Sequence, residues 1–154
     1  MKPLDGVKVI DLTHMLAGPY AGMVLADLGA EVVKIEPLGN GEMTRGLLKD
    51  DPNYSFKGFG AYFLTLNRNK KSVSIDLKSE EGLNVFYDLI KSADIVLNNF
   101  SAGVVKKLKI DFKNLEKINP KIITCSITGF GETGPHSSRP AYDQIVQAYS
   151  GGMS

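Results

Sequence analysis

A single cysteine among the 154 residues excludes a framework of internal disulfides. Cys125 lies in the apolar run of residues 122–127, which has the composition of a strand. Cysteines outside disulfides are usually buried, so the sequence predicts an inert thiol in the core rather than an exposed nucleophile.

Long apolar runs are also missing. No segment approaches the roughly 20 apolar residues that a membrane-spanning helix needs, and residues 1–6 lack the apolar centre of a secretory signal. We therefore expect a cytoplasmic protein with no membrane partner.

The chain has no excess of charge of either sign. It carries 18 basic and 17 acidic residues, with a formal net charge of +1. No overall field would attract nucleic acid, so we expect no nucleic-acid partner, and any anion site must be local. Basic residues cluster at 68–71 and 106–109, with Lys78 nearby. A solvated face is the general interpretation of such clusters, and an anion site is the alternative.

Nucleotide and metal motifs are absent as well. Nothing matches a Walker loop, and the turn after the first strand (residues 13–19) reads Thr-His-Met-Leu-Ala-Gly-Pro instead of a glycine fingerprint, so NAD is not expected. His14 and His136 do not share a metal-ligand spacing with Cys125 or a carboxylate pair, so no metal is expected either. His14 follows a strand, where a ligand contact and a packing role are equally open.

What is present is a regular alternation of strand and helix patterns. With 43% hydrophobic residues, the chain can bury one sizeable core. The alternation predicts an α/β fold, a Rossmann-like doubly wound and mostly parallel sheet, as one unit over residues 1–154. The expected strands cover residues 7–11, 32–35, 73–76, 94–97 and 122–127. The expected helices cover residues 20–28, 80–90, 102–107, 111–118 and 142–149.

The second of these helices has the clearest local signals. Ser79 is placed to cap its start, and Glu80 and Glu81 in the first turn suit the helix dipole. An apolar stripe then predicts the buried face. The stripe consists of Leu83, Phe86, Leu89 and Ile90.

Three loops interrupt the regular pattern. Residues 37–60 form a stretch longer than connectors usually run, which indicates a functional loop, a partner-wrapping segment or local disorder. Residues 129–140 are rich in turn formers and leave the carboxyl end of a strand, where ligands bind in open α/β sheets. Residues 98–103 offer amides, an aromatic face and a helix start, which suit a phosphate-bearing ligand.

Specific strings then point to a family. Matching segments occur in family order over nearly the whole chain. They are residues 4–12, 16–21, 25–36, 39–46, 66–72, 75–78, 99–100, 119–120, 126–131 and 141–148. The chain closely resembles the N-terminal part of the class III coenzyme A transferases, the CaiB/BaiF family, which includes formyl-CoA transferase, carnitine CoA transferase and α-methylacyl-CoA racemase.

The resemblance implies the N-terminal fragment of a larger enzyme whose subunits interlock as a homodimer. Such enzymes use an aspartate as covalent nucleophile and pass through an aspartyl-CoA thioester. That aspartate is expected beyond Ser154, so the fragment alone should be inactive. Coenzyme A, carried as acyl-CoA, and a small carboxylic acid are the implied substrates.

The resemblance also implies contacts with coenzyme A and one residue that lines the active site. His14, Leu16 and Ala17 resemble the loop beside the thioester and pantetheine; Ile75 and Lys78 resemble the adenine-side contacts; Asn99, Phe100 and Lys107 resemble the elements near the diphosphate and pantetheine; Tyr142 resembles the active-site residue.

Three positions depart from family members. Leu16 and Pro37 stand where formyl-CoA transferase has a glutamine and an arginine, and Tyr142 stands where the racemases have a histidine for proton transfer. Transferase is therefore favoured over a racemase-like enzyme. A stand-alone CoA-binding module and an interaction protein built on a worn-down enzyme fold remain alternatives.

Overall fold

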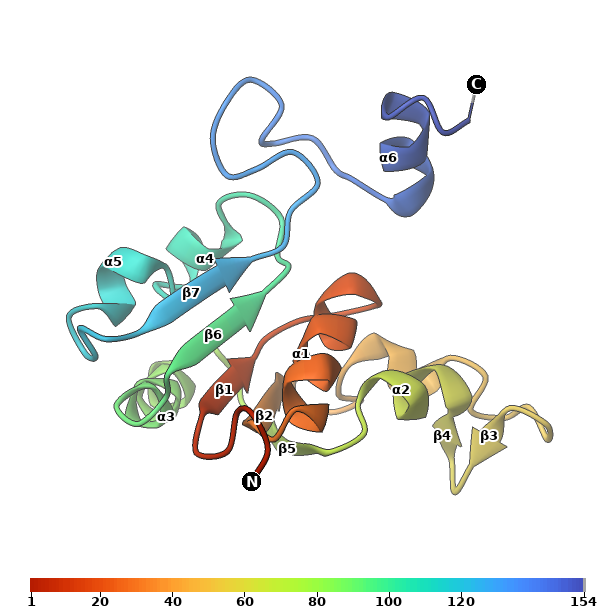
Figure 1. The fold of residues 1–154 in the computed structure, drawn as a ribbon, viewed down its shortest axis with the longest axis horizontal. Coiled ribbons are helices and arrows are strands. Elements are labelled where there is room, and N and C mark those ends of the chain that lie inside the picture. Colours follow the sequence, from red (N-terminus) through yellow and green to blue (C-terminus); the bar gives the residue numbers. More distant parts are fainter. Residues whose placement is uncertain (154) are drawn as a thin grey trace.

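The computed structural model describes residues 1–153 and has a five-stranded, fully parallel sheet at its centre, in the order β5-β2-β1-β6-β7 (Figure 1). The strands are β1 (Lys8–Asp11), β2 (Glu31–Glu36), β5 (Lys70–Ser74), β6 (Ile95–Asn98) and β7 (Ile123–Ser126). The predicted α/β fold with a parallel sheet is confirmed.

Helices connect the strands and cover both faces of the sheet. They are α1 (Ala17–Asp27), α2 (Ala61–Leu66), α3 (Glu80–Ile90), α4 (Val104–Lys107), α5 (Phe112–Leu115) and α6 (Asp143–Tyr149), with a 3-10 turn η1 (Met43–Gly46). A small antiparallel hairpin pairs β3 (Ser55–Phe56) with β4 (Phe59–Gly60). Within residues 1–153, no helix has the length and apolar character needed to cross a membrane.

Side-chain alternation along β1 divides the interior into two cores. Val9 points to the face covered by α1, where it packs in a cluster with Ala26. Ile10 points to the opposite face, in the larger cluster with Phe86 and Ile90 of α3. Because successive strand residues face opposite sides, a strand covered on both sides needs apolar residues in sequence.

The start of α3 follows its local sequence signals. The Ser79 hydroxyl accepts a hydrogen bond from the Gly82 amide at 3.0 Å, so the predicted cap is confirmed. Gly82 lies against the backbone: a Cβ atom there would sit 2.1 Å from the Asp76 carbonyl oxygen. This close approach explains why a glycine is kept inside the helix despite its cost.

The strand after α2 begins three residues earlier than the sequence pattern predicts. β5 starts at Lys70, whereas the expected strand started at Val73. The sequence pattern missed this start because Lys70 and Lys71 are charged. The Lys70 side chain is nevertheless buried and pairs with Asp11. Helix α2 was not predicted either.

The long segment of residues 37–60 packs against the sheet and carries short elements of its own. It contains η1, β3 and β4, and it buries Glu42 and Thr44, which are 1% and 0% exposed. Within the segment, the backbone at Gly60 lies so close to the backbone at Leu47 that a Cβ atom on Gly60 would be 1.5 Å from the Leu47 carbonyl oxygen.

Cys125 is exposed, so the prediction of a buried thiol is wrong. Its strand, β7, lies at the edge of the sheet. Ile123, its neighbour on the same face of the strand, is exposed too, at 60%. An apolar run predicts a strand, but only a covering layer buries its side chains.

We expect Phe86→Ala to lower the free energy of unfolding by about 3–5 kcal/mol, because Phe86 is 0% exposed at the centre of the larger core. The adjacent Val85→Ala is the matched control, since Val85 is 51% exposed on the same helix. Urea denaturation of both variants measures the difference. Equal losses would contradict this account of the core.

Candidate functional site

The site is centred where the strand order reverses. From β1 the chain builds outward through β2 and β5, then returns to the other side of β1 with β6 and β7. The reversal therefore lies between the neighbouring strands β1 and β6, at their carboxyl ends. In open parallel sheets, ligands bind in the crevice at such a point.

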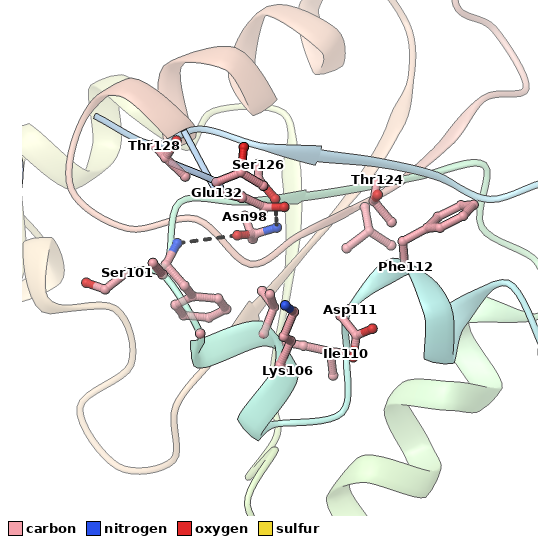
Figure 2. Close-up of a pocket in the computed structure, with 16 residues that line it drawn as sticks. Asn98, Ser101, Lys106, Ile110, Asp111, Phe112, Thr124, Ser126, Thr128 and Glu132 are labelled. Atoms are coloured by element: carbon pink, nitrogen blue, oxygen red, sulfur yellow. Dashed lines mark hydrogen bonds between the residues drawn. The ribbon is translucent and has the colours of Figure 1, made fainter. Parts of the chain in front are cut away.

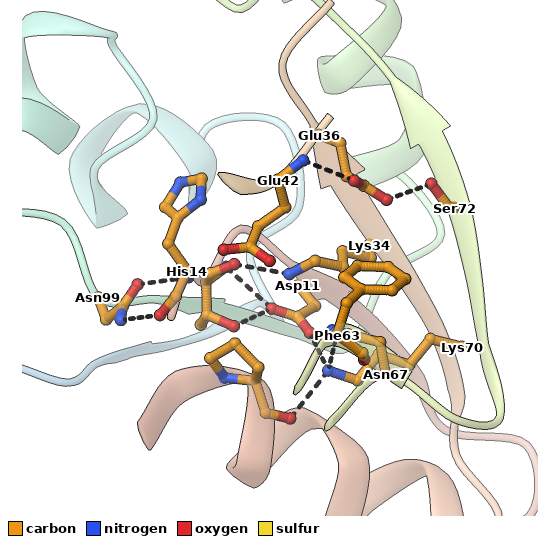
Figure 3. A network of polar contacts seen from close by, with 12 residues as sticks. Asp11, His14, Lys34, Glu36, Glu42, Phe63, Asn67, Lys70, Ser72 and Asn99 are labelled. Atoms are coloured by element: carbon orange, nitrogen blue, oxygen red, sulfur yellow. Dashed lines mark hydrogen bonds and ion pairs between the residues drawn. The ribbon is translucent and has the colours of Figure 1, made fainter. Parts of the chain in front are cut away.

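His14 follows β1, Asn99 follows β6, and the structure brings them into direct contact (Figure 3). The Asn99 side chain accepts from the His14 amide at 2.8 Å and donates to the His14 carbonyl at 2.7 Å. The His14 ring also lies 5.4 Å from the Phe100 ring. Three residues predicted as one surface are thus assembled.

Two buried side chains hold the same loop from beneath. The Lys34 amine donates to the Thr13 carbonyl at 2.7 Å, and the Met15 amide donates to the Glu42 carboxylate at 3.1 Å. Met15 has a φ of 67°, a left-handed conformation that is uncommon for a residue with a side chain. The loop backbone is therefore held by Lys34 of β2, by Glu42 of the segment of residues 37–60 and by Asn99 after β6.

A buried ion pair fixes the base of the site. The Lys70 amine lies 2.8 Å from the Asp11 carboxylate, and their side chains are 2% and 0% exposed. The amine also donates to the Pro19 carbonyl and the Asn67 side chain, at 2.8 and 3.0 Å. A Cβ atom on Gly22 would lie 2.6 Å from Asp11, so α1 approaches the pair only because Gly22 has no side chain.

The basic cluster of residues 68–71 is therefore not a uniformly solvated face. That interpretation is wrong for Lys70, which is buried. Arg68 pairs with Asp27, and Lys71 pairs with Glu31, both on exposed surface. Each of the three cations has a carboxylate partner, so the cluster is not a ready anion site.

Glu36, at the end of β2, is the centre of a second buried group. Burial alone would raise its pKa, but hydrogen bonds from Arg45, Ser72 and the Glu42 amide hold the pKa down at about 2. Arg45 reaches the carboxylate at 2.6 Å and covers the Phe63 ring of α2 at 4.0 Å. The contact ties residues 37–60 to the sheet.

A cavity of about 150 Å³ adjoins the crevice, between the ends of β6 and β7 and the start of α4 (Figure 2). Asn98 and Phe100 line it, and so does Lys106 rather than the predicted Lys107. Asp111 and Glu132 also line it, so the cavity carries more negative than positive side chains. A phosphate would therefore not be favoured inside it.

The remaining predicted contacts are distributed along the same sheet edge. Leu16 is 52% exposed at the start of α1, with Ala17 beside it. Lys78 and Lys107 are exposed, and among residues 1–153 neither amine lies within 4.0 Å of a carboxylate oxygen. Ile75 is 7% exposed and packs in the larger core, so a ligand would meet its backbone.

Tyr142 is separate from this group. It is 71% exposed and precedes α6, which stands away from the sheet in Figure 1. α6 is held by the loop before it: the Arg139 side chain donates to the Tyr149 hydroxyl, and the Phe130 and Tyr149 rings lie 5.5 Å apart. The structure does not bring Tyr142 to His14.

The buried residues Lys34, Glu36, Glu42 and Lys70 were missed as parts of the site. Lys34 and Glu36 alternate with apolar residues inside a strand that is buried on both faces. Charged residues at such positions are rarely buried unless paired, so their presence was an available signal. Over residues 1–153, no group of three or more His, Cys, Asp or Glu side chains is arranged to hold a metal ion.

We expect Asp11→Asn to lower the free energy of unfolding by about 3–5 kcal/mol, because Lys70 would stay buried without its counter-charge. The exposed pair of Lys91 and Asp88 provides the control: Lys91→Ala should cost less than about 1 kcal/mol. Thermal and urea unfolding measure both. A cost for Asp11→Asn as small as that of the control would refute the pairing.

The imidazole of His14 should titrate below 6.5, because burial and the nearby Lys34 charge lower its pKa. The unfolded chain then binds the proton more readily, so the stability from this group is complete above pH 6.5 and is lost as the pH falls toward the folded-state pKa. Histidine NMR shifts followed against pH measure the midpoint. A midpoint at or above 6.5 would contradict the burial of this ring.

The chain has relatives among known proteins. Residues 4–154 match the family model described as CoA-transferase family III. The chain is 44% identical over 153 residues to succinyl-CoA:glutarate CoA-transferase of Mus musculus, covering 99% of this chain and 34% of the relative. It is 41% identical to formyl-CoA:oxalate CoA-transferase of Afipia carboxidovorans, covering 99% and 35%.

The fold has a solved counterpart. The crystal structure of a CaiB/BaiF family protein from Brucella suis superimposes with a TM-score of 0.89 at 42% identity, covering 97% of this chain and 39% of that one. The chain thus spans about a third of the length of the curated relatives it matches. The family match extends over nearly all of the sequence, and the chain belongs to CoA-transferase family III.

Proposed function

We propose that this chain is the coenzyme A-binding part of an enzyme that transfers coenzyme A from an acyl-CoA donor to a carboxylic acid acceptor. The observation that carries the proposal is the bridge between Asn99 and His14 at the reversal of strand order. Family membership supports it, since the named relatives act on acyl-CoA and carboxylate pairs.

The dimensions of the edge suit an extended ligand. Neighbouring strands lie ~4.8 Å apart, so the ends of β5 and β6 are roughly 14 Å apart across β2 and β1. Lys78 follows β5 and Lys107 follows β6, so the two lysines start from well-separated strand ends. They suit two separated phosphate groups of one long molecule, with His14 and Leu16 near its acyl end.

The chemical step requires a carboxylate nucleophile, which we place in polypeptide beyond this chain. An aspartate attacks the acyl-CoA carbonyl, forms a mixed anhydride and releases the coenzyme A thiolate. The thiolate attacks the aspartyl carbonyl, which leaves an aspartyl-CoA thioester and frees the donor acid. The acceptor carboxylate repeats the two steps in reverse order and carries the coenzyme away.

In this mechanism the present residues bind and orient the substrate. Burial and the nearby Lys34 lower the pKa of His14, which favours its neutral form, and the ring packs against Phe100 beside the loop that would receive the thioester. Tyr142 would reach the active site only through a different placement of α6. Transferase remains favoured over racemase, because Tyr142 has no basic nitrogen for proton transfer.

We further propose that the complete enzyme is a cytoplasmic homodimer. The segment of residues 47–60 leaves large apolar side chains uncovered, including Leu48, Tyr54 and Phe56, which are 51%, 57% and 63% exposed. Exposed apolar side chains grouped on one segment are typical of a surface that a further chain covers.

The chain alone should bind coenzyme A but show no thioester exchange. Lys78→Ala and Lys107→Ala should each weaken binding several-fold, because each removes one charge-assisted phosphate contact. Lys91→Ala is the control, since Lys91 is an exposed lysine at the C-cap of α3, away from the carboxyl ends of the strands. Calorimetry measures affinity, and an acyl-exchange assay measures turnover.

Unchanged affinity in both lysine variants would defeat the assignment of these contacts. Exchange by the chain alone would show that the nucleophile lies within residues 1–154. Turnover by a complete enzyme but not by this chain would exclude the alternative of a stand-alone binding module.

A further inference from the structure

Glu42 connects the segment of residues 37–60 with the loop of residues 13–16 that follows β1. It is 1% exposed, although it belongs to the segment of residues 37–60. One carboxylate oxygen accepts the Met15 amide at 3.1 Å, and the other accepts the Thr44 hydroxyl. The carboxylate thus has a partner for each oxygen.

The backbone of Glu42 continues the connection toward β5. Its amide donates to Glu36 at 2.8 Å, and Glu36 accepts the Ser72 hydroxyl of β5 at 2.5 Å. A continuous set of hydrogen bonds therefore runs from β5, past the end of β2, to the loop after β1. Figure 3 shows the part from Ser72 through Glu36 to Glu42. Buried networks of this kind hold geometry because every alternative leaves a polar group unpaired.

Met15 is the residue that this set of bonds constrains. Its φ of 67° persists in proteins only where the surroundings favour it. The hydrogen bond to Glu42 supplies such a constraint, while Asn99 holds the preceding residue, His14, from the other side. Leu16, the next residue, is 52% exposed and is placed by the direction in which Met15 turns the chain.

We propose that Glu42 is a positioning residue that sets the loop of residues 13–16 in its binding geometry and acts on the acyl end of the ligand, not on the nucleotide end. The inference rests on the proposed function for the identity of the ligand. The nucleotide end would meet Lys78, which follows β5, whereas the Glu42 carboxylate bonds to Met15 and Thr44.

The test compares Glu42→Leu with Glu42→Gln. Leucine removes the acceptor for the Met15 amide, whereas glutamine keeps a carbonyl oxygen there, and the Thr44 hydroxyl can accept from the new amide. Glu81→Leu, an exposed glutamate on α3, is the control. Calorimetry with coenzyme A and with adenosine 3′,5′-bisphosphate, which lacks the pantetheine arm, separates the two ends of the ligand.

We expect Glu42→Leu to weaken coenzyme A binding roughly tenfold and to leave adenosine 3′,5′-bisphosphate binding within about twofold of the wild type. Glu42→Gln should restore coenzyme A binding to within about twofold. Equal losses for both ligands would mean that Glu42 supports the fold in general, and no loss for coenzyme A would mean that it positions nothing. Either result would overturn the proposal.

Amide hydrogen exchange gives a readout that needs no ligand. In the wild-type chain the Met15 amide, which donates to Glu42, should exchange at least about tenfold more slowly than the amide of the half-exposed Leu16. This measurement decides the case even if Glu42→Leu does not fold, because equal exchange rates would show that the bond to Glu42 does not hold the loop. If the wild type fails to bind coenzyme A, the proposed function falls, and Met15 exchange still reports on Glu42.

Discussion

The ion pair between Lys70 and Asp11 is the contact on which the carboxyl edge of this sheet depends. Its two residues come from strands β5 and β1, which are separated by β2, and the pair also receives the first turn of α1 through the Pro19 carbonyl. Two charges taken out of water are tolerated only when they are paired and hydrogen-bonded. The arrangement therefore fixes the relative positions of two strands and a helix at once.

The rest of the polar edge follows from the same constraint. Parallel strands end together, so their last residues and the loops that follow compete for the same small volume. Lys34, Glu36 and Glu42 are each at most 1% exposed, and each has a partner. Among residues 1–153, no buried side-chain nitrogen or oxygen lacks a hydrogen bond. The loops at this edge are held rigidly, because displacing any of them would leave a buried polar group without a hydrogen bond.

In the proposed function, the ligand contacts would come from side chains that the buried hydrogen-bond network does not use. His14 presents its ring beside Phe100, while its backbone is bound to Asn99. Leu16, Lys78 and Lys107 remain exposed around it. The paired charges hold the backbone, and in the proposed function the unpaired or apolar groups are the ones that would contact the substrate.

Several elements could be predicted from the sequence, because the interactions that form them are local. The cap at Ser79, the stripe that buries Phe86 and the alternation of strands with helices all depend on residues a few positions apart, so they were predictable. The strand patterns of residues 7–11 and 94–97 also predicted that His14 and Asn99 follow the carboxyl ends of strands.

Which of these groups come into contact could not be predicted from the sequence, because the partners are far apart along the chain. Lys70 and Asp11 are 59 residues apart, and Asn99 and His14 are 85 apart. Charge partners at such separations leave no periodicity in the sequence, so Lys70 resembled a surface lysine. Cys125 looked buried for a related reason: burial depends on what covers a strand, and β7 lies at an edge.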